Sequence, residues 1–216
     1  VSVLLLLALG LMVALLLNQK LRGRNVARSI LFSPTILAGA AIAIVWIYIF
    51  DPRFGFIYAI LRPLGIPSPK WLTDPAWAMP AIIIVYVWKN LGYATVIFIA
   101  GLQAIPRELY EAARVDGAGV FARFWYITLP WLLQPLLIIL IVATMGSLRV
   151  FDLVYVLTGG GPGDATRVVT FTAYKKAFDA LDFGVANAYA YLLALLTLAL
   201  GLLYIKILYA RGEIEQ

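Results

Sequence analysis

The segment ELYEAARVDGAGVFARFWYITLP, residues 108–130, interrupts a chain that is otherwise dominated by apolar runs. It holds three acidic residues, two arginines and two glycines, and long apolar segments flank it on both sides. Backbone polar groups inside a bilayer must be satisfied within helices or closed barrels, so flanking apolar runs of this length predict membrane helices. We therefore expect residues 108–130 to form a polar connection held at the membrane surface between two spans.

The composition supports a membrane protein and excludes several chemistries. Of the 216 residues, 63% are hydrophobic and 13% are charged, whereas soluble domains are about half apolar and about a quarter charged. The sequence has no cysteine and no histidine, which excludes disulfides, thiolate nucleophiles, Cys/His metal sites and imidazole acid–base catalysis. The net charge of +6 is typical of basic loops on the cytoplasmic side, and we expect no nucleic-acid partner.

Five apolar segments are long enough to approach the roughly 17–25 residues that a spanning helix needs. They lack the alternation of a membrane barrel strand, so the sequence predicts an all-α polytopic membrane protein that forms one domain over residues 1–216. Pro34 is placed at the first turn of the second helix. The predicted spans are 1–17, 34–50, 78–101, 131–157 (most apolar over 131–148) and 185–207.

Basic residues in short loops predict the orientation. The loop after the first span is expected to be cytoplasmic because it holds four cations and no acid: Lys20, Arg22, Arg24 and Arg28. Alternation of the spans then places the 108–130 connection and the C-terminal tail on the cytoplasmic side. Lys206 and Arg211 near the tail are consistent with that placement, because basic residues favour the cytoplasmic side. This topology begins outside, so we expect a sixth, N-terminal span to precede Val1.

The polar connection contains a helix start and a helix stop. Pro106 is expected at the first helical position, and Glu108 and Glu111 near the N-terminus complement the helix dipole. Asp116-Gly117 ends the helix, because glycine readily adopts the left-handed conformation. A second short helix is predicted over 120–127, so two short helices should lie at an angle just off the membrane.

Two interpretations of the first short helix remain open. It could lie on lipid, but interfacial helices usually carry Lys and Arg on one face and large apolar residues on the other. This helix carries acids and the small residues Ala112 and Ala113 instead. That composition favours contact with another protein, whose groove could approach the small surface closely.

The connection resembles the EAA loop of ATP-binding-cassette importer permeases. The family pattern is met with every spacing kept over the loop, 105–130: Glu111-Ala112-Ala113, Gly117, Ile127 and Leu129-Pro130. The flanking segments AGLQAIPRELYEAARVDGAG, RVFDLVYVLTGGGPG and FDFGVANAYA resemble the carbohydrate-uptake branch, of the maltose, trehalose and glycerol-phosphate type. The resemblance assigns ATPase coupling to five residues: Glu111, Ala112, Ala113, Asp116 and Gly117.

The same resemblance implies the partners. A second permease would complete a heterodimer, a cytoplasmic ATPase dimer would use ATP-Mg, and a solute-binding protein would deliver substrate outside. The chain itself would bind no cofactor and catalyse no covalent chemistry. It would reside as a multi-pass protein in a prokaryotic plasma membrane.

Lys89 marks a candidate substrate cavity. It lies about ten residues from the outer end of its span, roughly 15 Å deep, where a cation needs water or a partner. In the resembled permeases, the substrate cavity is lined by the span before the EAA loop, at the depth of Lys89. It is also lined by the middle of the span after that loop. The candidates are therefore Trp88, Lys89, Asn90, Tyr93, Ala143, Gly146 and Ser147. Snorkelling by Lys89 and simple packing by the aromatic residues remain the alternatives.

Other features have structural interpretations. Arg149 and Asp152 are spaced to pair on one helix face. The run GGGPG, 159–163, is not followed by the Lys-Ser/Thr pair of a phosphate-binding loop and is not preceded by a strand. We therefore expect a sharp turn on the outer side. Residues 166–181 are expected to form a short amphipathic surface helix, and small residues in the last span permit close helix packing.

Two rival functions differ in what they require. An ion-coupled transporter tends to show inverted repeats and broken helices around a mid-membrane ion site. A membrane enzyme needs clustered carboxylates or a nucleophile beside a base. The sequence shows no repeat and no such cluster, so an importer permease is favoured, for a sugar or for another solute.

Overall fold

The structure is a computed structural model that describes residues 1–19 and 22–210, with the backbone alone for residues 205 and 207–210. Lys20 and Arg211, two of the cations used to predict the orientation, lie outside the described residues. The described residues form helices and connecting loops and contain no strand, which confirms the predicted all-α class. The helices are α1 (Ser2–Leu17), α2 (Arg24–Ile36), α3 (Gly39–Ile49), α4 (Phe56–Leu61), α5 (Pro75–Ala104), α6 (Arg107–Val115), α7 (Val120–Arg123), α8 (Leu129–Trp131), α9 (Leu133–Leu148), α10 (Asp152–Leu157), α11 (Val169–Phe178) and α12 (Phe183–Ala210).

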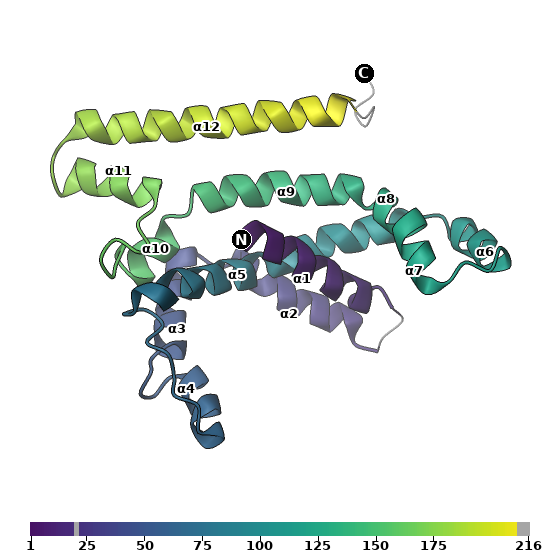
Figure 1. Ribbon diagram of the computed structural model, residues 1–216, viewed down its shortest axis with the longest axis horizontal. Coiled ribbons are helices and arrows are strands. Elements are labelled where there is room, and N and C mark those ends of the chain that lie inside the picture. Colours follow the sequence, from purple (N-terminus) through teal and green to yellow (C-terminus); the bar gives the residue numbers. More distant parts are fainter. Residues whose placement is uncertain (20–21, 211–216) are drawn as a thin grey trace.

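The longest helix, α5, forms the centre of the bundle, with α1 and α2 packed against it (Figure 1). Its start is specified locally, because Pro75 occupies the first turn and the side chain of Asp74 accepts a hydrogen bond from the Ala76 amide at 2.9 Å. Glycines allow the close approach of the other helices. A Cβ added at Gly10 of α1 would lie 2.9 Å from the Cβ of Ala94.

The second predicted span, 34–50, is not one helix. Helices α2 and α3 meet at an angle of 106° around Leu37 and Ala38, whose backbone is extended. Pro34 lies in the last turn of α2 and not in the first turn of a helix, so that part of the prediction was wrong. The tertiary packing explains the break, because α2 lies along α5 whereas α3 packs against α10.

The fourth predicted span is also interrupted. Residues 120–131 form α7, a π-helical turn (Phe124–Thr128) and α8 in succession, and α9 follows with a bend of 60°. Helix α9 ends at Leu148, and α10 begins only at Asp152. The extension of one continuous span to residue 157 was therefore wrong, because the backbone of residues 149–151 departs from helical geometry.

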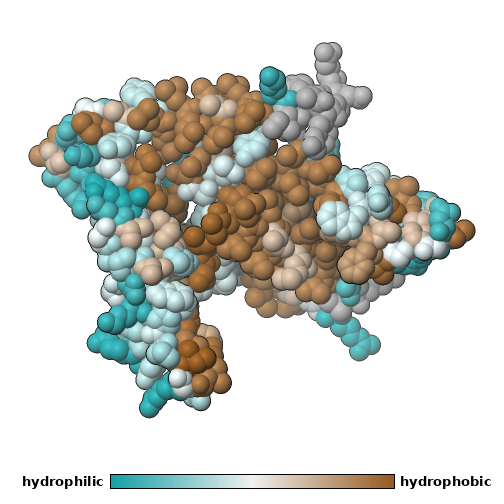
Figure 2. Space-filling view, in the orientation of Figure 1, coloured by the Kyte–Doolittle hydropathy of each residue, from teal (hydrophilic) through white to brown (hydrophobic). Residues whose placement is uncertain are grey.

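By length and composition, α5 and α12 are each able to cross a membrane, and up to four spans result if each bent pair counts as one. Helix α1 is apolar but has only 16 residues. Apolar residues cover the middle of the molecule and much of α12, while polar residues gather toward the ends of the molecule (Figure 2). This band between two polar ends is the pattern expected of a protein surrounded by lipid.

The end of the molecule predicted to lie outside is built largely from short helices. Helices α3, α5, α10 and α11 enclose an apolar core that includes Phe50, Val85 and Phe171. The predicted turn at 159–163 is present: Gly159, Gly160 and Gly163 all have positive φ. The expected surface helix at 166–181 corresponds to α11.

Candidate functional site

A cavity of about 240 Å³ lies between α1, α5, α9 and α10, beside the break that separates the last two. It collects most of the residues that the sequence placed in a substrate cavity. The predicted residues that line it are Lys89, Asn90, Tyr93, Ala143 and Gly146. We refer to this space as the central cavity.

Two predicted residues do not line the central cavity. Trp88 is 42% exposed and packs edge-on against Trp46 of α3, with 5.4 Å between ring centroids. Ser147 borders a separate cavity and donates a hydrogen bond to the Thr144 carbonyl oxygen at 2.9 Å. Consecutive helical residues lie about 100° apart around the axis, so a neighbour of a lining residue faces elsewhere.

Tyr86 is a lining residue that the sequence analysis missed. Its buried hydroxyl donates a hydrogen bond of 2.9 Å to the carbonyl oxygen of Ala143, and so joins α5 to α9. The Asn90 side-chain amide donates to the Tyr86 carbonyl oxygen at 2.8 Å. The missed signal was helical spacing, since Tyr86, Asn90 and Tyr93 recur at intervals of four and three.

Three charged side chains also line the central cavity: Lys89, Arg149 and Asp152. The predicted ion pair between Arg149 and Asp152 was wrong, because no ion pair of the described residues includes either of them. Arg149 caps the end of α9, whereas Asp152 begins α10 and its carboxylate lies against Gly39. Gly39 is the first residue of α3, where the helix dipole stabilises a nearby negative charge.

The EAA segment forms a helix with the predicted end. Helix α6 runs from Arg107 to Val115, and Gly117 follows with φ of +76°. Its amide donates to the Arg114 carbonyl oxygen at 3.1 Å, and the Ala118 amide donates to that of Ala113 at 2.8 Å. Pro106 precedes the helix by one residue with extended backbone, so its predicted helical position was off by one.

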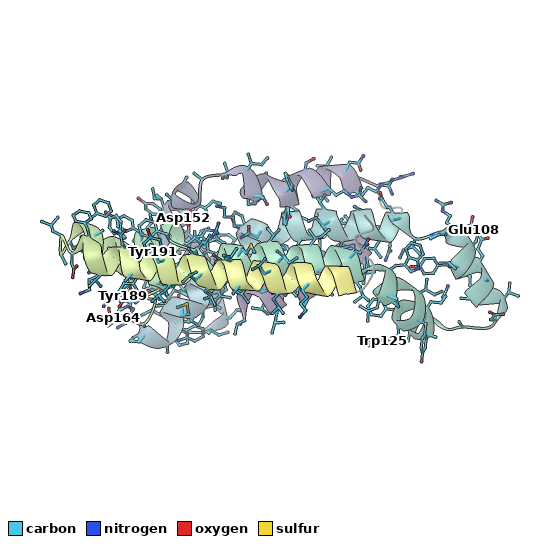
Figure 3. All side chains as sticks on the ribbon, turned by 90° about the horizontal axis from the view of Figure 1, so that it is seen from above. Glu108, Trp125, Asp152, Asp164, Tyr189 and Tyr191 are labelled. Carbon is cyan, nitrogen blue, oxygen red and sulfur yellow. The ribbon has the colours of Figure 1, made fainter. Side chains whose placement is uncertain are left out.

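Helix α6 projects from one end of the molecule, as Figure 1 shows. Figure 3 places Glu108 of this helix and Asp152 of the central cavity toward opposite ends of the long helices. Glu111, Ala112, Asp116 and Gly117 are exposed, and Ala113 is half-buried. The side facing the bundle is anchored, because the hydroxyl groups of Tyr110 and the buried Thr128 are 2.8 Å apart.

The chain matches known proteins over nearly all of its length. Residues 7–211 match the family described as binding-protein-dependent transport system inner membrane component. The chain is 42% identical to the trehalose/maltose transport system permease protein MalF of Thermococcus litoralis, over 92% of this chain and 67% of that protein. It is 36% identical to the sn-glycerol-3-phosphate transport system permease protein UgpA of Brucella abortus, over 90% of this chain and 67% of the relative.

A solved structure has the same fold. A chain of the bacterial alginate ABC transporter, crystallised in complex with an alginate pentasaccharide-bound periplasmic protein, superposes with a TM-score of 0.83. The match covers 96% of this chain and 74% of that chain, at 23% identity. Sequence, fold and EAA loop agree, and the chain belongs to the inner membrane components of binding-protein-dependent transport systems, the permeases of ATP-binding-cassette importers.

Proposed function

We propose that this permease forms half of the path through which a sugar or sugar derivative is imported, and that the central cavity contacts the solute. The observation that carries the proposal is the convergence of Lys89, Asn90 and Tyr93 with α9 around one space. Amide, ammonium and phenol groups beside apolar walls suit a small polyhydroxylated ligand, because they supply both donors and acceptors.

The solutes named for two relatives support the choice of a polyhydroxylated solute. The names of the relatives specify trehalose or maltose in one case and sn-glycerol-3-phosphate in another. A neutral disaccharide and a phosphorylated polyol share hydroxyl groups but differ in charge. The charged residues Lys89, Arg149 and Asp152 would then discriminate among such solutes at the central cavity.

The driving force is proposed to enter through α6. Its exposed surface, with Glu111 and Ala112, suits a cleft in a cytoplasmic ATPase that uses ATP-Mg. Movement of α6 would be transmitted to the long helices through the contact between Tyr110 and Thr128, because Thr128 precedes α8 and α9 in the same chain segment. The permease itself would bind no nucleotide.

A second permease would supply the other half of the path, and a solute-binding protein would dock at the outer end. Helix α12 supports the need for a partner or lipid, because only 11% of its most apolar window is buried within the described chain. The assembly would sit in a prokaryotic plasma membrane.

The test is uptake into proteoliposomes that contain the permease with its partner permease, ATPase and solute-binding protein. Radiolabelled maltose, trehalose and glycerol-3-phosphate should be compared with and without ATP inside the vesicles. We expect ATP-dependent uptake of at least one of them, which Asn90→Leu weakens and Ser147→Ala leaves unchanged. Uptake that persists without ATP but is abolished by an ionophore would instead establish ion coupling and refute the proposal.

A further inference from the structure

A second cavity, of about 460 Å³, lies at the opposite end of the molecule, beneath α6. It is bounded by the end of α1, the end of α5, helices α6 and α7 and the π-helical turn. Its walls are largely apolar: Leu15, Leu102, Val120, Phe121 and Phe124. We refer to it as the inner cavity, and neither the central cavity nor the exposed face of α6 explains it.

Two arginines line the inner cavity without a counter-charge. Arg114 and Arg123 take part in none of the ion pairs of the described residues, and no described residue that lines the cavity is acidic. The Nε atom of Arg123 is buried and has no hydrogen-bond partner in the described chain. A buried charged donor without an acceptor is costly, so the site has the properties of a place where an anion is bound.

The surroundings indicate what carries the anionic group. Apolar walls next to two cations fit an amphiphile better than a free ion, since a free ion would gain nothing from the walls. Trp125 and Tyr126 come two and three residues after Arg123 and are 60% and 83% exposed. Trp and Tyr with exposed rings are enriched at the level of the lipid headgroups. Trp125 lies at the same end of the molecule as Glu108 (Figure 3).

We propose that the inner cavity binds one anionic phospholipid of the cytoplasmic leaflet. Its phosphate group accepts hydrogen bonds from Arg114 and Arg123, and its acyl chain packs on the apolar walls. Basic pockets beside membrane helices on the cytoplasmic side suit such headgroups because guanidinium groups match phosphate oxygens. Since α6 and the π-helical turn both border the inner cavity, the lipid would brace α6 against the helices that it moves.

Native mass spectrometry of the assembled importer tests the proposal. The complex, with its partner permease and ATPase, is titrated with phosphatidylglycerol and separately with phosphatidylcholine. We expect one phosphatidylglycerol to bind in preference to phosphatidylcholine. Affinity should fall roughly fivefold for each arginine removed, in Arg114→Gln and in Arg123→Gln, and about thirtyfold in the double variant.

The matched control is Arg22→Gln, which removes the same charge from an exposed position in the same predicted cytoplasmic region and outside the cavity. It should bind phosphatidylglycerol as the unmodified importer does. Arg114→Gln keeps the test valid if Arg123→Gln fails to assemble, because Arg114 is exposed.

Several outcomes would overturn the proposal. One is equal binding of the two lipids, and another is undiminished phosphatidylglycerol binding in Arg114→Gln. A third is binding that appears in the permease pair but disappears when the ATPase is present. That last result would show that the ATPase covers the arginines.

Discussion

The hydroxyl group of Tyr86 on α5 donates a hydrogen bond of 2.9 Å to the carbonyl oxygen of Ala143 on α9. The two residues are separated by 57 positions in sequence, and the bond crosses one wall of the central cavity. A Cβ added at Gly146, one turn further along α9, would lie 2.9 Å from the same hydroxyl oxygen. The tyrosine therefore holds two spans at a defined separation.

Removing this hydroxyl group should loosen the contact between α5 and α9. For Tyr86→Phe we expect a loss of about 0.5–1.5 kcal/mol in the free energy of unfolding, the usual net value of one hydrogen bond. The measurement is thermal unfolding of the detergent-purified importer. Tyr93→Phe is the matched control, since the described chain offers that hydroxyl no hydrogen-bond partner. An equal effect of both changes would contradict a special role for Tyr86.

The packing of α2 on α5 should depend on Gly92. A Cβ at this position would lie 2.6 Å from the Cα of Phe32, and backbone atoms cannot rotate away as a side chain can. We expect Gly92→Ala to destabilise the protein by about 1–3 kcal/mol through overpacking. Gly119→Ala is the control, because its added Cβ would have nothing within 4 Å. Unchanged thermal stability of Gly92→Ala would refute the predicted clash.

Gly39 and Asp152 should show energetic coupling. An alanine methyl group at position 39 would collide with the Asp152 carboxylate, so Gly39→Ala should displace α10 from α3. In a double-mutant cycle, Asp152→Ala should restore part of the stability that Gly39→Ala removes, with a coupling of about 0.5–3 kcal/mol. Chemical unfolding of the four proteins measures the coupling. Strict additivity would show that the two residues do not interact.

Changes in α6 and at its end should separate ATP hydrolysis from transport. Gly117 requires a positive φ that proline cannot adopt, and its amide donates a hydrogen bond that Gly117→Pro would remove. Glu111→Lys reverses a charge on the exposed face. In proteoliposomes both variants should lose most uptake while the ATPase remains active, and Gly119→Ala should behave normally. Normal uptake by either variant would argue against coupling through this surface.

The orientation is testable with single cysteines because the chain has none of its own. Arg22→Cys should react with a membrane-impermeant maleimide only when the cytoplasmic side is exposed. Lys70→Cys, an exposed position between η1 (Arg62–Leu64) and α5, should react from outside. The reversed pattern would invert the predicted topology.

Hydropathy located the long apolar helices but not their interruptions. The apolar runs at 78–101 and 185–207 became α5 and α12, because a run of that length has one stable conformation in lipid. Lys89, Asn90 and Tyr93 line the central cavity together, whereas Trp88 packs against Trp46. Depth in the membrane follows from position along the chain, but the direction of a side chain depends on how the helix is rotated against its neighbours.

The sequence by itself determined the helical class and the end of α6 at its glycine stop, because each depends on groups only a few residues apart. The tertiary structure alone decided where two spans break and where a cavity opens. The breaks near Ala38 and Arg149 allow α3 to pack on α10, a contact between segments more than a hundred residues apart. No local propensity encodes such a contact, since its free energy appears only when both segments are already in place.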